Sequence, residues 1–368
     1  MVNLINKDAG IANRGNLSRI KNVMRKAQNG ENLTIAFLGG SITQGCLSSA
    51  PETCYAYLTY KWWTDTFPDA KFTYCNAGIG GTTSHFGVGR VDEDLLSMKP
   101  DFVIVEFSVN DESNEFFEET YEGLIRKIYT SETKPAVLIV NNVFYNNGGN
   151  AELIHNRIGR HYQIPCVSMQ SSIYPEVAHG RINNRDITPD DLHPNDNGHM
   201  LLATVIAHFL NKTLADIANN ETECVYPEPI TTNRYENALR YRNKDIVACL
   251  DGFTADIEAQ KDLTDCFKGG WSSNKPGARF TVEVEGSEIA VQYRKSMSRK
   301  SLKAFVTVDD DDSHTVVLDG NFDENWGDKL ELTVVAEHLE KKCHKVTLTT
   351  EDVDAEVPFY LVSLIVAK

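Results

Sequence analysis

The 368-residue chain has no apolar run long enough to cross a membrane, since a spanning helix needs about 20 such residues. Its first eight residues, Met1 to Asp8, also lack the basic segment and apolar core of a secretory signal. From these two absences we expect a cytoplasmic protein without a membrane partner.

Paired cysteine motifs are missing as well. The sequence has eight cysteines but no Cys-x-x-Cys pair and no spacing typical of a zinc site. They lie at positions 46, 54, 75, 166, 224, 249, 266 and 343. In a cytoplasmic protein we expect reduced thiols. A disulfide between Cys249 and Cys266 stays open as an alternative.

Basic residues are fewer than acidic ones. The chain has 36 Lys and Arg residues against 52 Asp and Glu residues, which gives a formal net charge of -16. A surface with this balance repels nucleic acid and anionic membranes. The composition therefore predicts no nucleic-acid partner and favours a neutral substrate.

Strand-like and helix-like segments alternate over about the first 210 residues. Short apolar runs predict strands at 33–38, 71–76, 101–107, 135–143 and 165–169. Helical patterns follow at 54–66, 87–98, 115–131, 151–162 and 195–210. Such alternation predicts an α/β fold with a doubly wound parallel sheet, and we expect the flavodoxin-like strand order 2-1-3-4-5.

The pattern changes after a polar, proline-containing stretch. We predict a first domain over residues 1–215, a linker over 216–240 and a second domain over 241–368. Within the last range, residues alternate with period two at 279–285, 289–294, 303–308 and 345–349, and 359–367 adds a terminal strand. These short strands predict an all-β, antiparallel sandwich.

Residues suited to chemistry follow the first three predicted strands. Ser41 comes after Gly39-Gly40 at the end of strand one, Gly81 follows strand two and Asn110 follows strand three. Parallel strands joined by right-handed crossovers end at the same edge of the sheet, and strand one lies between strands two and three in the predicted order. We therefore expect these residues to be neighbours where ligands bind.

A serine hydroxyl becomes a useful nucleophile when a base removes its proton. His193 is the candidate base, because a carboxylate three residues earlier, on Asp190, can accept from one ring nitrogen while the other faces Ser41. Asp191 is a rival carboxylate, and His199 ends a second Asp-x-x-His. We expect His199 to pack inside a helix. The alternative for Ser41 is a turn serine that caps a helix.

Ester cleavage also needs donors aimed at the oxyanion. The candidates are the backbone N–H groups of Ser41 and Gly81 and the side-chain amide of Asn110. Gly40 is predicted to let the substrate approach, because it has no side chain. The alternatives are that Gly80-Gly81 is only a tight turn and that Asn110 only caps the next helix.

These blocks resemble those of the SGNH hydrolases, also called GDSL esterases. The matching segments are Gly39-Gly40-Ser41, Asn76 to Gly81, Val109-Asn110-Asp111 and Asp190 to His193. The family's serine block usually reads Gly-Asp-Ser, and glycine at position 40 is a departure seen mainly in carbohydrate-acting branches. The resemblance covers residues from about 33 to 210. It implies a three-layer α/β/α fold, a triad of Ser41, His193 and Asp190, and no metal or other cofactor.

An esterase domain followed by a β-sandwich is similar to carbohydrate acetylesterases that carry a carbohydrate-binding module, in particular bacterial deacetylases of β-mannan fragments. The resemblance implies a serine esterase that removes O-acetyl groups from oligosaccharides through an acetyl-enzyme. Alternatives are a lipase-like or thioesterase activity, with residues 84–87 and 116–117 lining an acyl pocket, and a non-catalytic carbohydrate-binding protein. The sequence leaves the oligomeric state open.

The tryptophans and a run of aspartates carry further predictions. Trp326 lies in a polar, loop-like segment and is predicted to contact the sugar, with Trp271 a second candidate; the alternative for each is core packing. On the helix of the first domain, we expect at least one of Trp62 and Trp63 to be core. The run Asp309 to Asp312 suits either structural calcium or a solvated hairpin turn.

Overall fold

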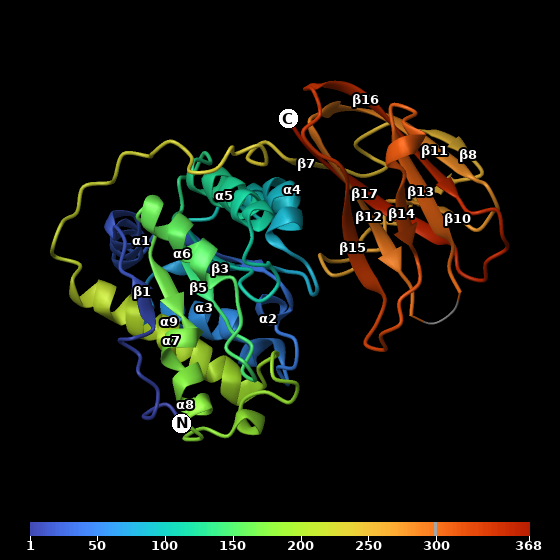
Figure 1. The fold of residues 1–368 in the computed structure, drawn as a ribbon. Helices are drawn as coiled ribbons and strands as arrows, with labels where there is room; N and C mark the ends of the chain where they lie inside the picture. Colours follow the sequence, from blue (N-terminus) through green and yellow to red (C-terminus); the bar gives the residue numbers. More distant parts are fainter. Residues whose placement is uncertain (298–299) are drawn as a thin grey trace. The chain divides into compact units, whose positions relative to one another are not determined.

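The parallel sheet of the first part of the chain has the predicted order. In this computed structural model, which describes residues 1–297 and 300–368, the sheet order is β1-β6-β5-β4-β2-β3 (Figure 1). The parallel strands are β2 (Asn32–Gly39), β3 (Lys71–Gly78), β4 (Phe102–Glu106), β5 (Ala136–Asn141) and β6 (Cys166–Ser168). Sequence reasoning missed β1 (Ile11–Asn13), which pairs antiparallel with β6 and is too short to show a periodic pattern.

Helices cover this sheet in two groups. One group is α1 (Ser18–Gln28), α3 (Tyr55–Thr66) and α9 (Asp196–Ala215), and the other is α4 (Ser84–Asp94), α5 (Glu115–Tyr129) and α6 (Glu152–His161). In α1 the buried apolar residues recur every three or four positions, as an amphipathic helix requires. Short turns of helix complete the unit: α2 (Ser41–Gln44), α7 (Met169–Ser172), α8 (Tyr174–Ala178), η1 (Pro51–Thr53), η2 (Leu96–Met98) and η3 (Asn184–Asp186). The three-layer α/β/α prediction is confirmed.

The register of the strands aligns the candidate motifs. Gly39 at the end of β2 pairs with Gly78 of β3 on one side and with Glu106 of β4 on the other. Every residue of β4 and β5 is buried. Trp63 lies in the same core, fully buried and 5.3 Å from the ring of Phe102, as expected for one tryptophan of the pair.

The chain divides into two units, Met1–Asn233 and Arg234–Lys368, and the division falls inside the predicted 216–240 linker. Much of that stretch is bound to the first unit. Glu221 pairs with the buried Lys21, and Glu122 of α5 accepts hydrogen bonds from the backbone N–H groups of Ile230 and Thr231. The stretch predicted as a linker is therefore bound to α1 through the Glu221 side chain and to α5 through backbone N–H groups.

The second unit consists of two antiparallel sheets around one core, which confirms the predicted β-sandwich. One sheet has the order β15-β12-β17-β10-β9, with β7 also paired to β17; the other has the order β14-β13-β16-β11-β8. The strands are β7 (Leu239–Tyr241), β8 (Cys249–Asp251), β9 (Thr254–Ala255), β10 (Trp271–Ser273), β11 (Arg279–Gly286), β12 (Glu288–Lys295), β13 (Lys303–Val308), β14 (Val316–Asp319), β15 (Lys329–Ala336), β16 (Lys342–Thr350) and β17 (Phe359–Ala367), and η4 spans Asp312–His314. Among the described residues, we find no helix with the length and apolar character of a membrane span.

Candidate active site

Gly39 and Gly40 lead the chain from β2 into α2, where Ser41 is the first residue. A Cβ atom on Gly39 would lie 2.2 Å from the Thr43 hydroxyl, and one on Gly40 would lie 2.3 Å from Oδ1 of Asn110. A Cβ atom on Gly39 would also lie 2.5 Å from the backbone carbonyl of Glu106, so no side chain fits there. At position 40 a side chain, such as the aspartate of the usual Gly-Asp-Ser block, would require the Asn110 side chain to move.

The structure brings Ser41, His193 and Asp190 together. The Ser41 hydroxyl donates to Nε2 of His193 at 2.8 Å, and Nδ1 of His193 donates to Oδ2 of Asp190 at 2.7 Å. The Ser41 residue is 9% exposed and the His193 side chain is 22% exposed. Ser41 is therefore the more buried of the two residues, and the imidazole is the more exposed.

The Asp190 carboxylate is held by more than the imidazole. Its Oδ1 accepts from the backbone N–H groups of His193 at 2.7 Å and Leu192 at 3.1 Å. Desolvation opposes ionisation of this carboxyl, but the hydrogen bonds from the His193 ring and from these N–H groups outweigh it, and the pKa of Asp190 is lowered. The carboxylate is thus kept ionised and fixed in direction.

The two rival residues lie elsewhere. Asp191 has a positive φ of 72°, its side chain binds Asn184 and Arg185, and its carbonyl accepts from the N–H of Tyr145 at 2.7 Å. His199 is buried in α9, as expected, where Nδ1 accepts from the N–H of Tyr55 and burial lowers its pKa to about 4. Neither residue contacts Ser41.

Of the predicted oxyanion donors, Gly81 lies in the loop that follows β3. It has a φ of 70°, a conformation that favours glycine. The neighbouring Gly80 lies beside the serine, since a Cβ atom on Gly80 would be 3.6 Å from that of Ser41. The N–H of Gly80 donates to Oε1 of Gln44 at 2.7 Å, so α2 holds this loop in place.

Asn110, whose side-chain amide is another predicted oxyanion donor, lies in the loop that follows β4. Its N–H donates to the carbonyl of Phe107 in a tight turn, and its side chain lies against Gly40. The Oδ1 atom is buried and has no hydrogen-bond partner among the described residues, and the amide Nδ2 is the group able to donate to a ligand. The loops after β3 and β4 therefore flank Ser41, because β2 lies between these two strands.

Several polar residues that support this edge of the sheet were not found from the sequence. The Arg90 side chain is fully buried, pairs with Asp94 and donates to the carbonyl of Ala77 at 2.7 Å. Asn76 donates to the carbonyl of Thr43 at 2.8 Å. Arg90 thus binds the end of β3 and Asn76 links β3 to α2. Asn76 was noted only as the start of a motif, and the single charged residue Arg90 gave no signal of its role.

A second such group is Glu106, the last residue of β4. It is fully buried and accepts from the hydroxyls of Ser108 at 3.2 Å and Thr43 at 3.5 Å. Burial raises the pKa of Glu106 to about 7, against the smaller effect of its hydrogen bonds. Glu106 therefore contacts Thr43, which lies two residues after Ser41 in α2, and is an ionisable group behind the proposed nucleophile.

The second unit presents one exposed tryptophan. Trp326 is 59% exposed and packs edge-on against Phe322, with ring centroids 5.1 Å apart. Trp271 is only 2% exposed and packs on Phe280, so for this residue the core alternative holds. Trp326 is the member of the pair that can meet a ligand.

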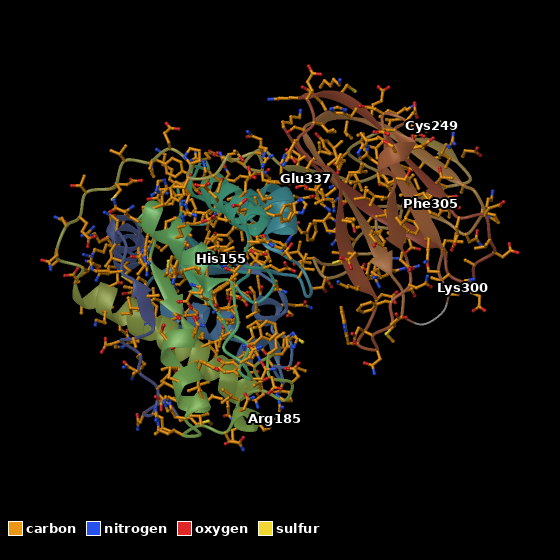
Figure 2. All side chains as sticks on the ribbon, in the orientation of Figure 1. His155, Arg185, Cys249, Lys300, Phe305 and Glu337 are labelled. Carbon is orange, nitrogen blue, oxygen red and sulfur yellow. The ribbon has the colours of Figure 1, made fainter. Side chains whose placement is uncertain are left out.

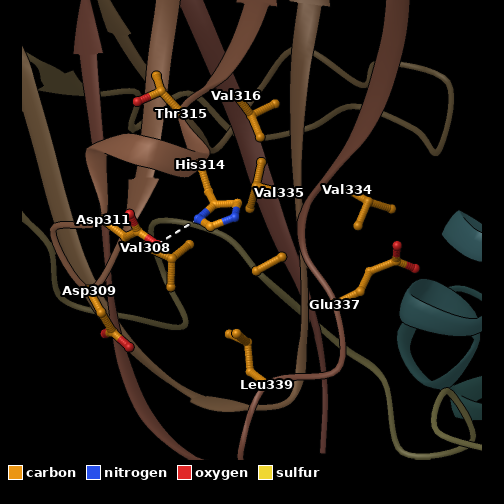
Figure 3. Close-up of a pocket in the computed structure, with 11 residues that line it drawn as sticks. Val308, Asp309, Asp311, His314, Thr315, Val316, Val334, Val335, Glu337 and Leu339 are labelled. Atoms are coloured by element: carbon orange, nitrogen blue, oxygen red, sulfur yellow. Dashed lines mark hydrogen bonds and ion pairs between the residues drawn. The ribbon is translucent and has the colours of Figure 1, made fainter.

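The second unit also contains an open hollow of about 650 Å³, shown in Figure 3. Valines such as Val308 and Val335 form part of its wall, and His314 on its rim is bonded to Asp311. None of its lining residues is a tryptophan, tyrosine or phenylalanine. It therefore lacks the large aromatic rings on which sugars usually stack.

The aspartate run is a hydrogen-bonded turn. Asp309 binds His344 and the N–H of Lys345, Asp310 pairs with the Lys345 side chain, and Asp311 caps η4. Within residues 1–297 and 300–368, no group of three or more His, Cys, Asp or Glu side chains is suited to hold a metal ion. Cys249 and Cys266, which the sequence left open as a disulfide, carry free thiols, as do the other six cysteines.

Comparisons with known proteins place this geometry in context. Residues 37–201 match the GDSL-like Lipase/Acylhydrolase family. The thioesterase 1/protease 1/lysophospholipase L1 of Escherichia coli strain K12 is 23% identical over 199 residues, 51% of this chain and 86% of the relative. An acetylxylan esterase of Geobacillus stearothermophilus is 26% identical over 209 residues, 48% of this chain and 93% of the relative.

Two solved structures are similar over both units. A two-domain esterase (CEX) active on acetylated mannans is 60% identical, with 99% of each chain covered and a TM-score of 0.97. The structure of such an esterase co-crystallised with mannopentaose is also 60% identical, covers 99% of this chain and 98% of that one, and has a TM-score of 0.96.

Proposed function

The chain belongs to the GDSL-like lipase/acylhydrolase family, and on this premise we propose that it is a serine esterase that removes O-acetyl groups from acetylated manno-oligosaccharides. The relative that is active on acetylated mannans supports the substrate class, because it shares both units at 60% identity. The observation that carries the reaction is the hydrogen-bonded chain from Ser41 through His193 to Asp190.

In the first half of the reaction, Oγ of Ser41 attacks the carbonyl carbon of the acetyl group. Nε2 of His193, already within hydrogen-bond distance, takes the hydroxyl proton as the new C–O bond forms. Asp190 keeps the Nδ1–H tautomer and stabilises the imidazolium that results.

The attack places negative charge on the former carbonyl oxygen. The N–H groups of Ser41 and Gly81 and the amide of Asn110 are the donors proposed for this oxyanion. Because they are held by the fold before the substrate arrives, they stabilise the charge without reorganising. This electrostatic contribution is usually the largest in acyl transfer.

The tetrahedral intermediate then breaks its bond to the sugar oxygen. His193 returns its proton to that oxygen, which releases a free sugar hydroxyl and leaves an acetyl ester on Ser41. Water attacks this ester, gives its proton to His193, and a second collapse releases acetate and restores the Ser41 hydroxyl. No cofactor or metal enters these steps.

Sugar recognition is assigned to Trp326 of the second unit. Sugars bind proteins by placing their C–H faces on aromatic rings, and the Trp326 ring is both exposed and steadied by Phe322. The co-crystal of the related esterase with mannopentaose supports an oligosaccharide partner. Gly40, predicted from the sequence to admit the substrate, contributes by leaving room for Asn110 beside the serine.

The alternatives receive less support. A lipase-like or thioesterase activity needs an apolar groove for the acyl chain. Of the residues predicted to line it, His85 and Phe86 are buried, which leaves only Phe116 and Phe117 partly exposed. A non-catalytic carbohydrate-binding protein is expected to lack part of the triad, whereas all three residues are present and hydrogen-bonded. We propose a cytosolic location, in which the eight free thiols would stay reduced.

The direct test is release of acetate from acetylated manno-oligosaccharides, followed by mass spectrometry, with acetylated xylo-oligosaccharides as the matched substrate. We expect wild-type enzyme to deacetylate the manno series faster and Ser41→Ala to release no acetate from either. Full activity of Ser41→Ala would overturn the mechanism. Equal or faster turnover of the xylo series would overturn the substrate assignment alone.

A further inference from the structure

We propose that Asp111 and His155 are a positioning pair that sets the geometry of the oxyanion pocket, an inference that rests on the function proposed above. Neither residue contacts the triad. Asp111 follows Asn110 in the chain, and His155 lies on α6, inside the first unit (Figure 2). Their side chains are both completely buried.

The Asp111 carboxylate joins two loops that approach the serine from opposite sides. Its Oδ1 accepts from the N–H of Ser84 at 2.8 Å, at the start of α4 and three residues after Gly81. Its own backbone belongs to the loop after β4 that carries Asn110. Because β2 lies between β3 and β4, this hydrogen bond spans the nucleophile's strand and fixes the separation of the two proposed donors.

The local sequence does not supply this bond. Thr83, the residue that precedes α4, makes no side-chain capping hydrogen bond, so the carboxylate of Asp111 takes the place of a cap from another loop. A negative charge at the start of a helix is favoured by the helix dipole. Asp111 is thus a tertiary cap whose direction also sets the position of Asn110.

His155 fixes the direction of that carboxylate. Its Nε2 donates to Oδ2 of Asp111 at 3.1 Å, so both carboxylate oxygens are occupied. The imidazole is held in turn by Tyr121 of α5, whose ring stacks on it at a centroid distance of 3.6 Å and an angle of 10°. The start of α6, the helix that carries His155, is also bound to the loop after β4, since the N–H of Ala151 donates to the carbonyl of Ser108 at 2.7 Å.

Two substitutions separate hydrogen bonding from packing. His155→Phe keeps a ring that can stack on Tyr121 but loses the donor, whereas His155→Gln loses the ring but keeps a donor for Asp111. We expect His155→Phe to lower kcat on p-nitrophenyl acetate by about tenfold with little change in KM, and His155→Gln to retain most of the activity. Full kcat in His155→Phe, or a larger loss in His155→Gln, would overturn the inference.

Ile158→Ala is the control for a loss of stability that does not involve the Asp111–His155 pair. Ile158 is buried on the same helix, three residues beyond His155. This variant should lower the unfolding temperature and leave kcat unchanged when assayed well below that temperature. If Ile158→Ala lowers kcat as much as His155→Phe does, the pair has only a structural role and the inference fails.

A double-mutant cycle tests the route through Asn110. We expect Asn110→Ala alone to lower kcat by about a hundredfold. In the double variant with His155→Phe, the loss of kcat should be smaller than the product of the two single losses, because the Asn110 amide that the pair positions is already absent. Losses that multiply would overturn the inference while leaving the esterase assignment intact. Wild-type kcat in Asn110→Ala would overturn the oxyanion assignment and this inference with it, whereas activity in Ser41→Ala would refute the proposed function itself.

Discussion

The side chain of Gln44 accepts a hydrogen bond from the backbone N–H of Gly80 at 2.7 Å, and this contact joins the helix that begins at Ser41 to the loop that carries Gly81. A residue three positions after the proposed nucleophile therefore helps to place one of its proposed oxyanion donors. Gln44 itself is exposed, so it contributes little to the core.

This contact makes a first prediction. Gln44→Ala should lower kcat by about tenfold with a small effect on KM, because the Gly81 N–H loses its fixed direction. Steady-state kinetics on p-nitrophenyl acetate would measure the split. Gln28→Ala, an exposed glutamine at the end of α1, is the matched control and should keep wild-type kcat. Equal kinetics of the two variants would show that the contact is incidental.

The choice between two adjacent aspartates gives a second prediction. Asp190→Asn should lower kcat by about a thousandfold or more, since an amide cannot stabilise the His193 imidazolium and can enforce the wrong ring tautomer. Asp191→Asn should stay within a few-fold of wild type, because that side chain faces Asn184 and Arg185. The reverse ranking in an acetate-release assay would reassign the acid of the triad.

A substitution at Trp326 tests sugar binding independently of ester cleavage. Trp326→Ala should lower kcat/KM on acetylated manno-oligosaccharides by about tenfold, equal to roughly 1.4 kcal/mol, and leave p-nitrophenyl acetate turnover unchanged. Phe305→Ala, which removes another exposed ring of the second unit (labelled in Figure 2), is the control and should affect neither substrate. A parallel loss on both substrates in Trp326→Ala would argue against a sugar contact.

Glu106 predicts how stability depends on pH. Its pKa is about 7 in the folded protein and 4.5 is its ordinary value, so between these values the folded state keeps a proton that the unfolded chain has released. The free energy of unfolding must then fall as the pH rises through this range. Glu106→Gln removes this effect, and at pH 8 it should be more stable than wild type by about 3 kcal/mol.

Denaturant unfolding at pH 4 and pH 8 would measure this difference. At pH 4 the carboxyl is protonated in both states of the protein, so the variant and the wild type should differ little there. A stability difference that does not change between the two pH values would mean that Glu106 is not the group responsible.

The order of the strands and the neighbourhood of the site followed from the sequence for a simple reason. Parallel strands joined by right-handed crossovers all end at one edge, so motifs placed after strands one, two and three had to meet. The triad spacing Asp190 to His193 is local, which is why a pattern of four residues was enough to suggest it. Period-two strands of the second unit such as β11 and β16 were equally visible, because buried and more exposed residues alternate along them.

Other contacts between residues far apart in the chain could not be predicted from any sequence pattern. Asp111 gave a signal only as a neighbour of Asn110, and nothing in the sequence linked it to Ser84 or to His155, 44 positions away. The same holds for Glu106, whose raised pKa depends on burial, and for the stretch around Thr231, whose polar composition indicates a linker although its backbone binds Glu122.

The sequence by itself determined which chemical groups reach one edge of the sheet, because chain connectivity and strand period act locally and leave regular patterns. The tertiary structure alone decided how those groups are held: which side chains tie the two loops across β2, and which carboxyl is buried at the end of β4. Burial and hydrogen bonding between distant residues depend on three-dimensional packing, and no single stretch of sequence records them.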